Sequence, residues 1–214
     1  MFLKRLQVGA LAANCYIIAD EKNKNAAIID PGGDADEIIK IITKEHLIVK
    51  YIFLTHGHSD HISALKEVKN ATDAKIAIHE QDAPMLLSPK DNLSIYFGEG
   101  FIQPPPDIIL KGNEKFEVGD LVLEIIHTPG HTPGGISIKV GNIVFTGDTL
   151  FAGSVGRTDF PGGSYDELIN SIREKLLPLG DNISILPGHG EPSTLSIEKK
   201  INPFLCNSWN FIII

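Results

Sequence analysis

The sequence predicts an α/β domain in which helices and β-sheets form layers. Two observations support this prediction. Short apolar runs of strand length alternate with amphipathic helical segments, and groups of strands followed by a helix occur in both halves of the chain. A chain of 214 residues is long enough for one domain with a substantial core. We therefore expect a single domain over residues 1–214.

The first half predicts strands and helices in alternation. Two β-rich runs stop at Asp30–Gly33, whose Asp-Pro-Gly-Gly sequence is typical of a turn. The isoleucines within residues 38–42 give the following helix an apolar face through about Glu45. Asp34 or Asp36 can cap this helix. The expected elements are strands at 14–19, 26–29, 49–54 and 75–78, and helices at about 34–45, 61–69 and 81–87.

The second half begins with a long irregular segment, residues 88–107, which is rich in Pro, Gly and aromatic residues. Within a compact domain, a stretch of this length is more often a functional loop than a linker. Gly141 and Asn142 then predict a hairpin turn between two strands. The expected elements are strands at 115–118, 121–127, 135–140, 142–146 and 183–186, a helix at 165–177 and at least a helical turn at 196–200.

The N-terminal residues imitate a secretion signal, because Lys4 and Arg5 precede an apolar stretch. Gln7 and Asn14 interrupt that stretch, and residues 16–19 continue it as a strand, so we favour a first β-strand over a signal. No run reaches the roughly 18 apolar residues that a membrane span needs. We therefore expect a cytoplasmic protein with no membrane partner.

The composition is that of a soluble globular protein. Charged residues make up 21% and hydrophobic residues 43%, which excludes the disordered and fibrous classes. The net charge of -8 disfavours a nucleic-acid partner, because proteins that bind phosphate backbones concentrate Lys and Arg. The only cysteines, Cys15 and Cys206, imply no disulfide framework, and we interpret both as small apolar groups.

The segment Leu54–Ile62, L-T-H-G-H-S-D-H-I, is the most informative part of the chain. Directly after an apolar run, it places four candidate ligands within six positions: His56, His58, Asp60 and His61. Imidazole nitrogen and carboxylate oxygen are ligands that zinc, iron and manganese accept. Burying these groups without an ion would be costly. The alternative is a solvated polar loop, and the rest of the chain argues against it.

Three further polar residues each follow or end a run that predicts a strand. They are His131 in T-P-G-H-T-P-G, Asp148 in F-T-G-D-T-L and His189 in L-P-G-H-G. Polar groups held at strand ends on a rigid backbone are a common form of active site. Seven candidate ligands are too many for one four-coordinate ion, whereas a carboxylate can bridge two ions. The residues therefore predict a dinuclear metal centre.

The order His-X-His-X-Asp-His, then His, Asp and His, resembles the metallo-β-lactamase-fold hydrolases, and most of all glyoxalase II and its short relatives. Motifs at 147–151 (G-D-T-L-F), 156–160 (G-R-T-D-F), 187–190 (P-G-H-G) and 202–204 (N-P-F) match that branch. The resemblance covers nearly the whole chain and implies the four-layer αβ/βα sandwich of this fold. It implies no separate C-terminal helical domain, such as the long glyoxalase II enzymes use to contact glutathione.

The resemblance also implies how the ligands divide between two divalent ions. One set is His56, His58 and His131, the other is Asp60, His61 and His189, and Asp148 bridges them. Zinc is the expected metal, with iron and manganese as alternatives. Two ions about 3.5 to 4 Å apart can share a water, lower its pKa toward about 7 and so supply a bridging hydroxide. We place Asp60 and Asp148 among the catalytic residues.

The implied activity is the hydrolysis of small acyl-thioesters of the S-lactoylglutathione type, so the expected partner is a small-molecule thioester. A thiol of pKa about 8.5 can leave as thiolate without a dedicated general acid. The use of glutathione stays open. Asp159 stands where the long enzymes carry a tyrosine. Lys199 and Lys200 match basic residues of the short members, or form a solvated helix end.

Two further residues carry two interpretations each. In this superfamily the residue that matches Asp30 orients a metal ligand, but Asp-Pro-Gly also favours a turn or a helix cap. Arg157 should lie at the rim of the pocket and could bind a substrate carboxylate, although an internal pair with Asp159 is slightly favoured. We interpret the remaining histidines as structural or solvated: His46, His79 and His127.

The G-R-T-D-F motif also resembles the persulfide dioxygenases. These enzymes share the fold but use a single iron, held by residues that correspond to His56, His131 and Asp148. A metal-stabilised module without catalysis is a third hypothesis, although structural zinc sites are normally closed and rich in sulfur. The apolar residues 209–214 either pack on the domain or form a strand for a partner subunit, which would make a homodimer.

Overall fold

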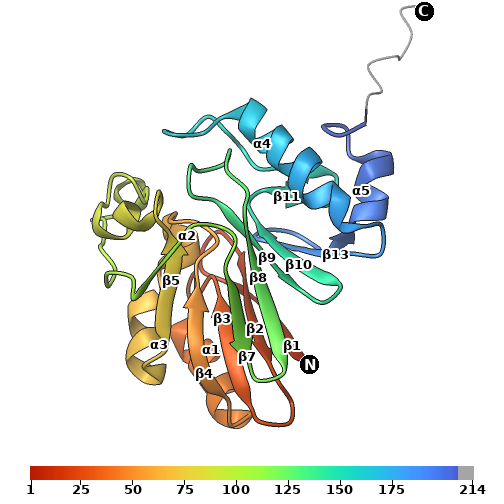
Figure 1. Cartoon of the computed structure of the whole chain (residues 1–214). Coiled ribbons are helices and arrows are strands. Elements are labelled where there is room, and N and C mark those ends of the chain that lie inside the picture. Colours follow the sequence, from red (N-terminus) through yellow and green to blue (C-terminus); the bar gives the residue numbers. More distant parts are fainter. Residues whose placement is uncertain (207–214) are drawn as a thin grey trace, which may run out of the picture.

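The computed structural model describes residues 1–206, which fold into two packed six-stranded sheets with helices on both outer sides (Figure 1). From one outer side to the other, the layers are helix, sheet, sheet and helix. The predicted four-layer αβ/βα sandwich is therefore confirmed. The apolar segment 209–214 lies outside the described residues.

The first sheet contains the N-terminal half of the chain and has the strand order β1-β2-β3-β4-β5-β6. Its strands are β1 (Phe2–Val8), β2 (Ala13–Ala19), β3 (Asn25–Ile29), β4 (Ile48–Phe53), β5 (Lys75–His79) and β6 (Ile108–Leu110). β1 to β3 pair antiparallel, and β3 to β6 pair parallel. Helices α1 (Ala35–Lys44) and α3 (Leu65–Thr72) lie in the connections from β3 to β4 and from β4 to β5 and cover the outer face.

The second sheet has the order β14-β13-β10-β9-β8-β7, with β10 and β13 as its parallel pair. Its strands are β7 (Lys115–Val118), β8 (Leu121–His127), β9 (Ile136–Val140), β10 (Ile143–Gly147), β13 (Ser184–Pro187) and β14 (Ser193–Thr194). A small hairpin, β11 (Leu150–Phe151) and β12 (Ser154–Val155), follows β10. Helices α4 (Tyr165–Ser171) and α5 (Leu195–Ile201) cover the outer face of this sheet.

The core consists of three apolar layers, because each sheet is buried on both faces. Between the sheets, aromatic rings of both halves meet, and the ring centroids of Tyr16 and Phe145 lie 5.0 Å apart. Every residue of β2 is buried, which explains why this strand has a continuous apolar run rather than an alternating pattern. Ile38 and Leu65 pack against the outer face of the first sheet, and Leu168 against that of the second.

The structure departs from the predicted elements mainly in short segments. The helix expected at 61–69 is two helices, α2 (Ser59–Ile62) and α3, because the amide of Ala64 donates to the carbonyl of Pro31 instead of continuing one helix. The expected cap of α1 is wrong, because the Asp34 side chain accepts from the Gly9 amide and leaves the first turn uncapped. The strands β6, β11 and β12 had no sequence signal above that of loops.

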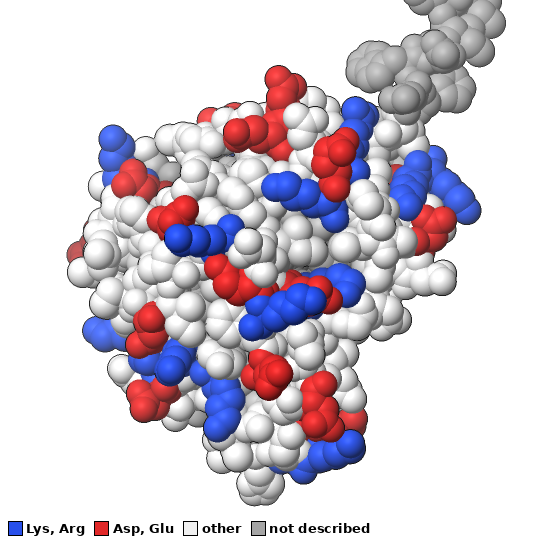
Figure 2. Space-filling view, in the orientation of Figure 1, with Lys and Arg blue, Asp and Glu red and all other residues white. Residues whose placement is uncertain are grey.

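The surface is of mixed charge on the face drawn in Figure 2, where Lys and Arg lie among Asp and Glu. None of the helices within residues 1–206 has the length and apolar character that a membrane crossing demands. Cys15 is buried, and burial raises the pKa of its thiol, in keeping with its interpretation as an apolar core residue.

Candidate metal centre

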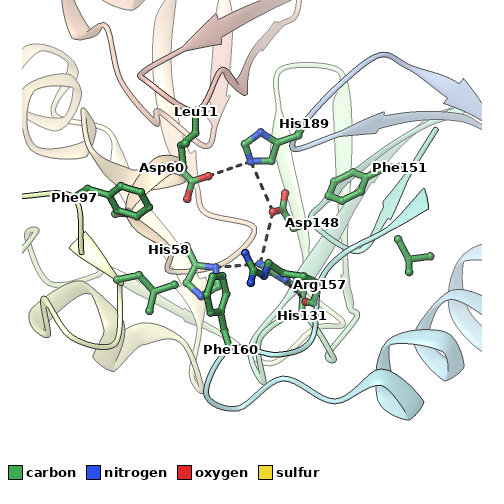
Figure 3. Close-up of a pocket in the computed structure, with 13 residues that line it drawn as sticks. Leu11, His58, Asp60, Phe97, His131, Asp148, Phe151, Arg157, Phe160 and His189 are labelled. Carbon is green, nitrogen blue, oxygen red and sulfur yellow. Dashed lines mark hydrogen bonds and ion pairs between the residues drawn. The ribbon is translucent and has the colours of Figure 1, made fainter. Parts of the chain in front are cut away.

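The ligand candidates lie at strand ends that meet at one edge of the two sheets. Residues 55–61 follow β4, and Asp30 follows β3 of the same sheet. From the second sheet, His131 follows β8, Asp148 follows β10 and His189 follows β13. The two halves of the chain therefore contribute to one site at the seam between their sheets. Figure 3 shows side chains of both halves pointing into a shared pocket.

The short helix α2 carries Asp60 and His61 and is held by close backbone packing. The amide of Ser59 donates to the carbonyl of Asn92, which joins α2 to the irregular segment 88–107. A Cβ atom at Gly32 would lie 1.8 Å from the carbonyl oxygen of Asp60. Glycine at this position therefore allows the turn after β3 to approach the ligand helix, which a side chain would prevent.

The first group of ligand atoms comes from His56, His58 and His131, all buried. Nδ1 of His58 and Nε2 of His131 are 3.0 Å apart, so both nitrogens point toward the same position. Nδ1 of His131 lies 2.7 Å from the carbonyl oxygen of Arg157. Because Nδ1 must carry the proton to donate to this carbonyl, Nε2 keeps a free lone pair on the side of the pocket.

The second group comes from Asp60, His61 and His189. Oδ2 of Asp60 lies 3.0 Å from Nε2 of His189 and 3.6 Å from Nε2 of His61. The His189 side chain reaches this group from the opposite sheet, and Figure 3 shows it facing Asp60 across the pocket. This arrangement combines two imidazoles and one carboxylate, a donor set that divalent metals accept.

Asp148 lies between the two groups and approaches members of both. Its Oδ1 is 3.4 Å from Nε2 of His61, and its Oδ2 is 3.6 Å from Nε2 of His131. Oδ2 is also 3.8 Å from Nε2 of His189. Oδ1 therefore faces the second group, while Oδ2 lies between the first group and His189, so the carboxylate is placed to bridge the two groups.

Several buried polar atoms of the site have no hydrogen-bond partner within residues 1–206. They are Nε2 of His56, Nε2 of His61 and Oδ1 of Asp148. Buried polar groups are almost always paired, because an unmet one costs about 1 to 3 kcal/mol. These three atoms all belong to ligand candidates, whereas Oδ1 of Asn14, the remaining unpaired atom among the described residues, does not. The donor set contains nitrogen and oxygen without sulfur. The residues therefore fit a divalent metal.

The electrostatics separate the histidines into two kinds. Burial lowers the pKa of His56, and burial together with His131 lowers the pKa of His58 to about 3. Burial acts against protonation of His61 as well, but Asp148, Asp60 and Asp30 outweigh it and raise the pKa of His61 to about 10. Without metal, positive charge on His61 balances the carboxylates, and a metal ion would take over that role.

Asp30 contacts the ligand His61 through the side away from the pocket. Its Oδ2 lies 3.0 Å from Nδ1 of His61 and accepts from Oγ1 of Thr55 at 2.6 Å, while its Oδ1 accepts from the Thr55 amide at 2.7 Å. The ligand-orienting interpretation of Asp30 requires such a contact. The side chain makes no helix cap, because α1 begins after Asp34.

Arg157 lies at the rim of a cleft of about 530 Å³ that contains ligands of both groups. Its guanidinium makes two hydrogen bonds with Asp159, at 2.7 and 2.6 Å, and stacks 3.9 Å above the ring of Phe160. The expected internal pair with Asp159 is therefore present. The Arg157 side chain is still 57% exposed and lines the cleft.

The other cleft walls are mostly apolar. Leu11 enters from the turn between β1 and β2, Phe97 from the segment 88–107 and Phe151 from β11 (Figure 3). Leu11 is 48% exposed and Phe97 67% exposed. The predicted functional role of segment 88–107 is consistent with this position, because Leu93 and Phe97 both line the cleft.

Asp82 is a site residue that the motifs did not identify. Its buried carboxylate accepts from Oγ1 of Thr132 at 2.7 Å, from the Gly134 amide at 2.7 Å and from the Gly57 amide at 3.2 Å. The sequence signal, an Asp before a short apolar helix, could not be distinguished from an ordinary helix cap. The groups that donate hydrogen bonds to Asp82 lie in loops from both halves of the chain.

The remaining histidines lie outside the ligand groups formed by the described residues. His79 is buried and its ring stacks on that of His127 with centroids 4.0 Å apart. His46 is exposed and has a positive φ of 54° at the end of α1. A structural role for the stacked pair and a solvated role for His46 are consistent with the prediction.

Comparison with known proteins identifies the family. The family model described as the metallo-beta-lactamase superfamily matches residues 8–189. The hydroxyacylglutathione hydrolase GloC of Haemophilus influenzae is 41% identical over 211 residues, which cover 96% of this chain and 98% of that protein.

Two solved structures are also similar over nearly the whole chain. The B3 metallo-beta-lactamase BLEG-1 has a TM-score of 0.90 at 35% identity, covering 95% of this chain and 99% of that one. The structure of TTHA1623 in a di-iron-bound form has a TM-score of 0.84 at 33% identity, covering 94% of this chain and 100% of that one.

Proposed function

The chain belongs to the metallo-beta-lactamase superfamily, and from this premise we propose that it is a dinuclear metal hydrolase of small acyl-thioesters, of the glyoxalase II type. The observation that supports this proposal most strongly is the position of Asp148 between two groups of ligand atoms. The proposed ligands are His56, His58, His131, Asp60, His61, His189 and Asp148. Zinc is the proposed metal, and the di-iron form of TTHA1623 keeps iron as an alternative.

When bound, the two ions would supply Lewis acidity at the thioester carbonyl and would lower the pKa of the attacking water. The chain's own residues supply orientation and charge. Asp60 lines the cleft and can accept a hydrogen bond from the attacking water, which directs the water toward the acyl carbon. Asp148 adds negative charge between the ligand groups, and Asp30 fixes the ring of His61.

The cleft favours a substrate that is apolar near its reacting centre and anionic at its outer end. Phe151 and Phe160 line the cleft beside the ligands and reduce access of bulk water. The exposed guanidinium of Arg157 can bind a carboxylate on the thiol portion of the substrate. A thiolate leaves readily near neutral pH, so the mechanism needs no separate general acid.

The relative GloC is called a hydroxyacylglutathione hydrolase, which supports a thioester substrate. Two contacts bear on whether glutathione itself is used. Lys199 donates to Asp181 at 2.5 Å, and Arg157 is paired with Asp159. Each cation thus has an acidic partner within the chain, and a substrate carboxylate would have to share Arg157 with Asp159 or displace it. We therefore propose small acyl-thioesters as the substrate class without restricting it to glutathione.

Release of thiol tests this proposal directly. The zinc-loaded protein should hydrolyse S-lactoylglutathione or a simpler thioester such as an acyl-N-acetylcysteamine, with free thiol measured by a chromogenic disulfide. A protein that binds two ions and releases thiol from none of these compounds would contradict it. A protein that binds one iron and consumes oxygen with glutathione persulfide would instead support a persulfide dioxygenase.

A further inference from the structure

The carboxylate of Asp82 joins the two loops that carry the His56, His58 and His131 side chains. Gly57, whose amide donates to Oδ2 at 3.2 Å, lies between His56 and His58. Thr132, whose hydroxyl donates to the same oxygen at 2.7 Å, directly follows His131. Since one loop follows β4 of the first sheet and the other follows β8 of the second, Asp82 connects ligands across the seam between the sheets.

Backbone hydrogen bonds hold Asp82 in place, so its carboxylate can fix the positions of both loops. Its amide donates to the carbonyl of His79 at the end of β5, and its carbonyl accepts from the Met85 amide at 2.9 Å. Its other oxygen, Oδ1, accepts from the Gly134 amide at 2.7 Å. A Cβ at Gly134 would lie 2.6 Å from this oxygen, so the bare backbone is what allows the carboxylate so close.

Hydrogen bonds, and no ion pair among the described residues, stabilise the charge of Asp82. The residue is 0% exposed, and no ion pair of Asp82 with Lys, Arg or His occurs within residues 1–206. Burial raises the pKa of Asp82, while the three hydrogen-bond donors oppose this. A buried carboxylate without a partner is costly, and a divalent ion on the adjoining loops would offset part of that cost.

We infer that Asp82 is a positioning residue that sets the spacing between the His56–His58 loop and His131, and so governs the affinity of this ligand group for a divalent ion. The inference rests on the proposed metal centre. We assign Asp82 to the first ligand group only. The hydrogen bonds of its side chain go to residues beside His56, His58 and His131, and none goes to Asp60, His61 or His189 among the described contacts.

Zinc affinity, measured by competition with a chromophoric chelator, tests this assignment without using catalysis. His189→Ala removes a ligand of the second group, so the ion bound by this variant reports the first group. Adding Asp82→Asn to His189→Ala should weaken zinc binding about 10- to 100-fold, the usual effect of losing an outer partner of a ligand. Adding Asp82→Asn to His131→Ala should leave the remaining zinc affinity unchanged.

The chain offers a matched control in Asp20. This carboxylate is also buried and also accepts three hydrogen bonds, from the amides of Lys22 and Asp120 and the side chain of Asn23. It lies in the turn before β3, at the opposite end of that strand from Asp30. Asp20→Asn should therefore lower the stability of the metal-free fold and leave zinc affinity at both groups unchanged.

Thr132 provides a second variant that keeps the carboxylate, in case Asp82→Asn does not fold. Thr132→Val removes one donor to Asp82 and should weaken zinc binding in the His189→Ala protein, while Thr132→Ser retains the hydroxyl and should restore it. Equal weakening in both histidine backgrounds, or no weakening in the His189→Ala background, would overturn the inference. If the His189→Ala protein bound no zinc at all, the proposed centre would be wrong, and this inference with it.

Discussion

Nδ1 of His61 lies 3.0 Å from Oδ2 of Asp30, and this buried contact joins the turn after β3 to the ligand helix α2. The other side of the ring presents Nε2 to Asp60 and Asp148, at 3.6 and 3.4 Å. A proton held on Nδ1 by Asp30 leaves Nε2 as the atom available to a metal. Asp30 also accepts two hydrogen bonds from Thr55, which fixes the first residue of the ligand loop.

Asp30→Asn should weaken zinc binding at the Asp60, His61 and His189 group about 10- to 100-fold. The side-chain NH2 group of the Asn would place a donor where Thr55 or His61 needs an acceptor. The measurement is zinc competition in the His131→Ala background, where the second group reports alone. Asp34→Asn is the control, because Asp34 has a positive φ that Asn tolerates and its side chain accepts only the Gly9 amide among the described contacts. Unchanged zinc affinity in Asp30→Asn would contradict the role of Asp30.

Arg157→Met should raise KM for thioesters that carry a carboxylate on the thiol portion, with kcat little changed. The reason is that a contact that stabilises the bound substrate and the transition state equally affects KM and leaves kcat unchanged. The loss should be about 1.5 to 3 kcal/mol in kcat/KM, the value of a hydrogen bond to a charged group. An uncharged acyl-N-acetylcysteamine is the control substrate, and its KM should not change. A loss of kcat on both substrates would show that Arg157 acts elsewhere.

Asp159→Ala should have the opposite effect, lowering KM for the same anionic thioesters. Removing Asp159 releases the guanidinium of Arg157 from its two internal hydrogen bonds. Stability should change by less than about 1 kcal/mol, because both side chains are exposed. Steady-state kinetics and urea unfolding measure the two effects. If KM rises instead, the pair is needed to hold Arg157 in its binding position.

Glu198→Ala should destabilise the fold by roughly 3 kcal/mol, because it removes three hydrogen bonds worth about 1 kcal/mol each, one of them to the buried Asn202. The Glu198 carboxylate is buried and accepts from Ser193, from the Gly153 amide and from Asn202, at 2.5, 2.8 and 2.8 Å. Glu198 thereby connects α5 to the β11–β12 hairpin through hydrogen bonds. This hairpin forms one wall of the cleft.

Glu191→Ala is the matched control for Glu198. Its carboxylate is exposed and pairs only with Arg5 among the described residues, so the free energy of unfolding should change by less than about 1 kcal/mol. Urea unfolding of both variants measures the difference. An equal loss in the two variants would mean that the buried network around α5 contributes little to stability.

The sequence predicted the parts of the fold and site that depend on local patterns. Apolar runs identified β2, β4 and β8, and the ligands at 56–61 stand out because they follow such a run. Local patterns alone predicted only a layered α/β domain, and the four-layer arrangement was predicted from the motif resemblance. The Arg157–Asp159 pair was foreseen because its two members are neighbours in sequence.

The features that were missed depend on contacts between distant segments. Asp82 acquires its role from loops at Gly57 and Thr132, which no local pattern links to it. The break between α2 and α3 is caused by the hydrogen bond from the Ala64 amide to the Pro31 carbonyl, and the helical periodicity of residues 61–69 gives no sign of it. β6 is only three residues long and is stabilised by its pairing with β5.

Metal content per chain, measured by elemental analysis of protein prepared without chelators, decides whether the centre is dinuclear. We expect about two divalent ions per chain, because Asp148 faces two complete ligand groups. Either alanine variant, His131→Ala or His189→Ala, should reduce this to about one. A wild-type protein that saturates with one ion, and keeps it in both variants, would contradict a dinuclear centre.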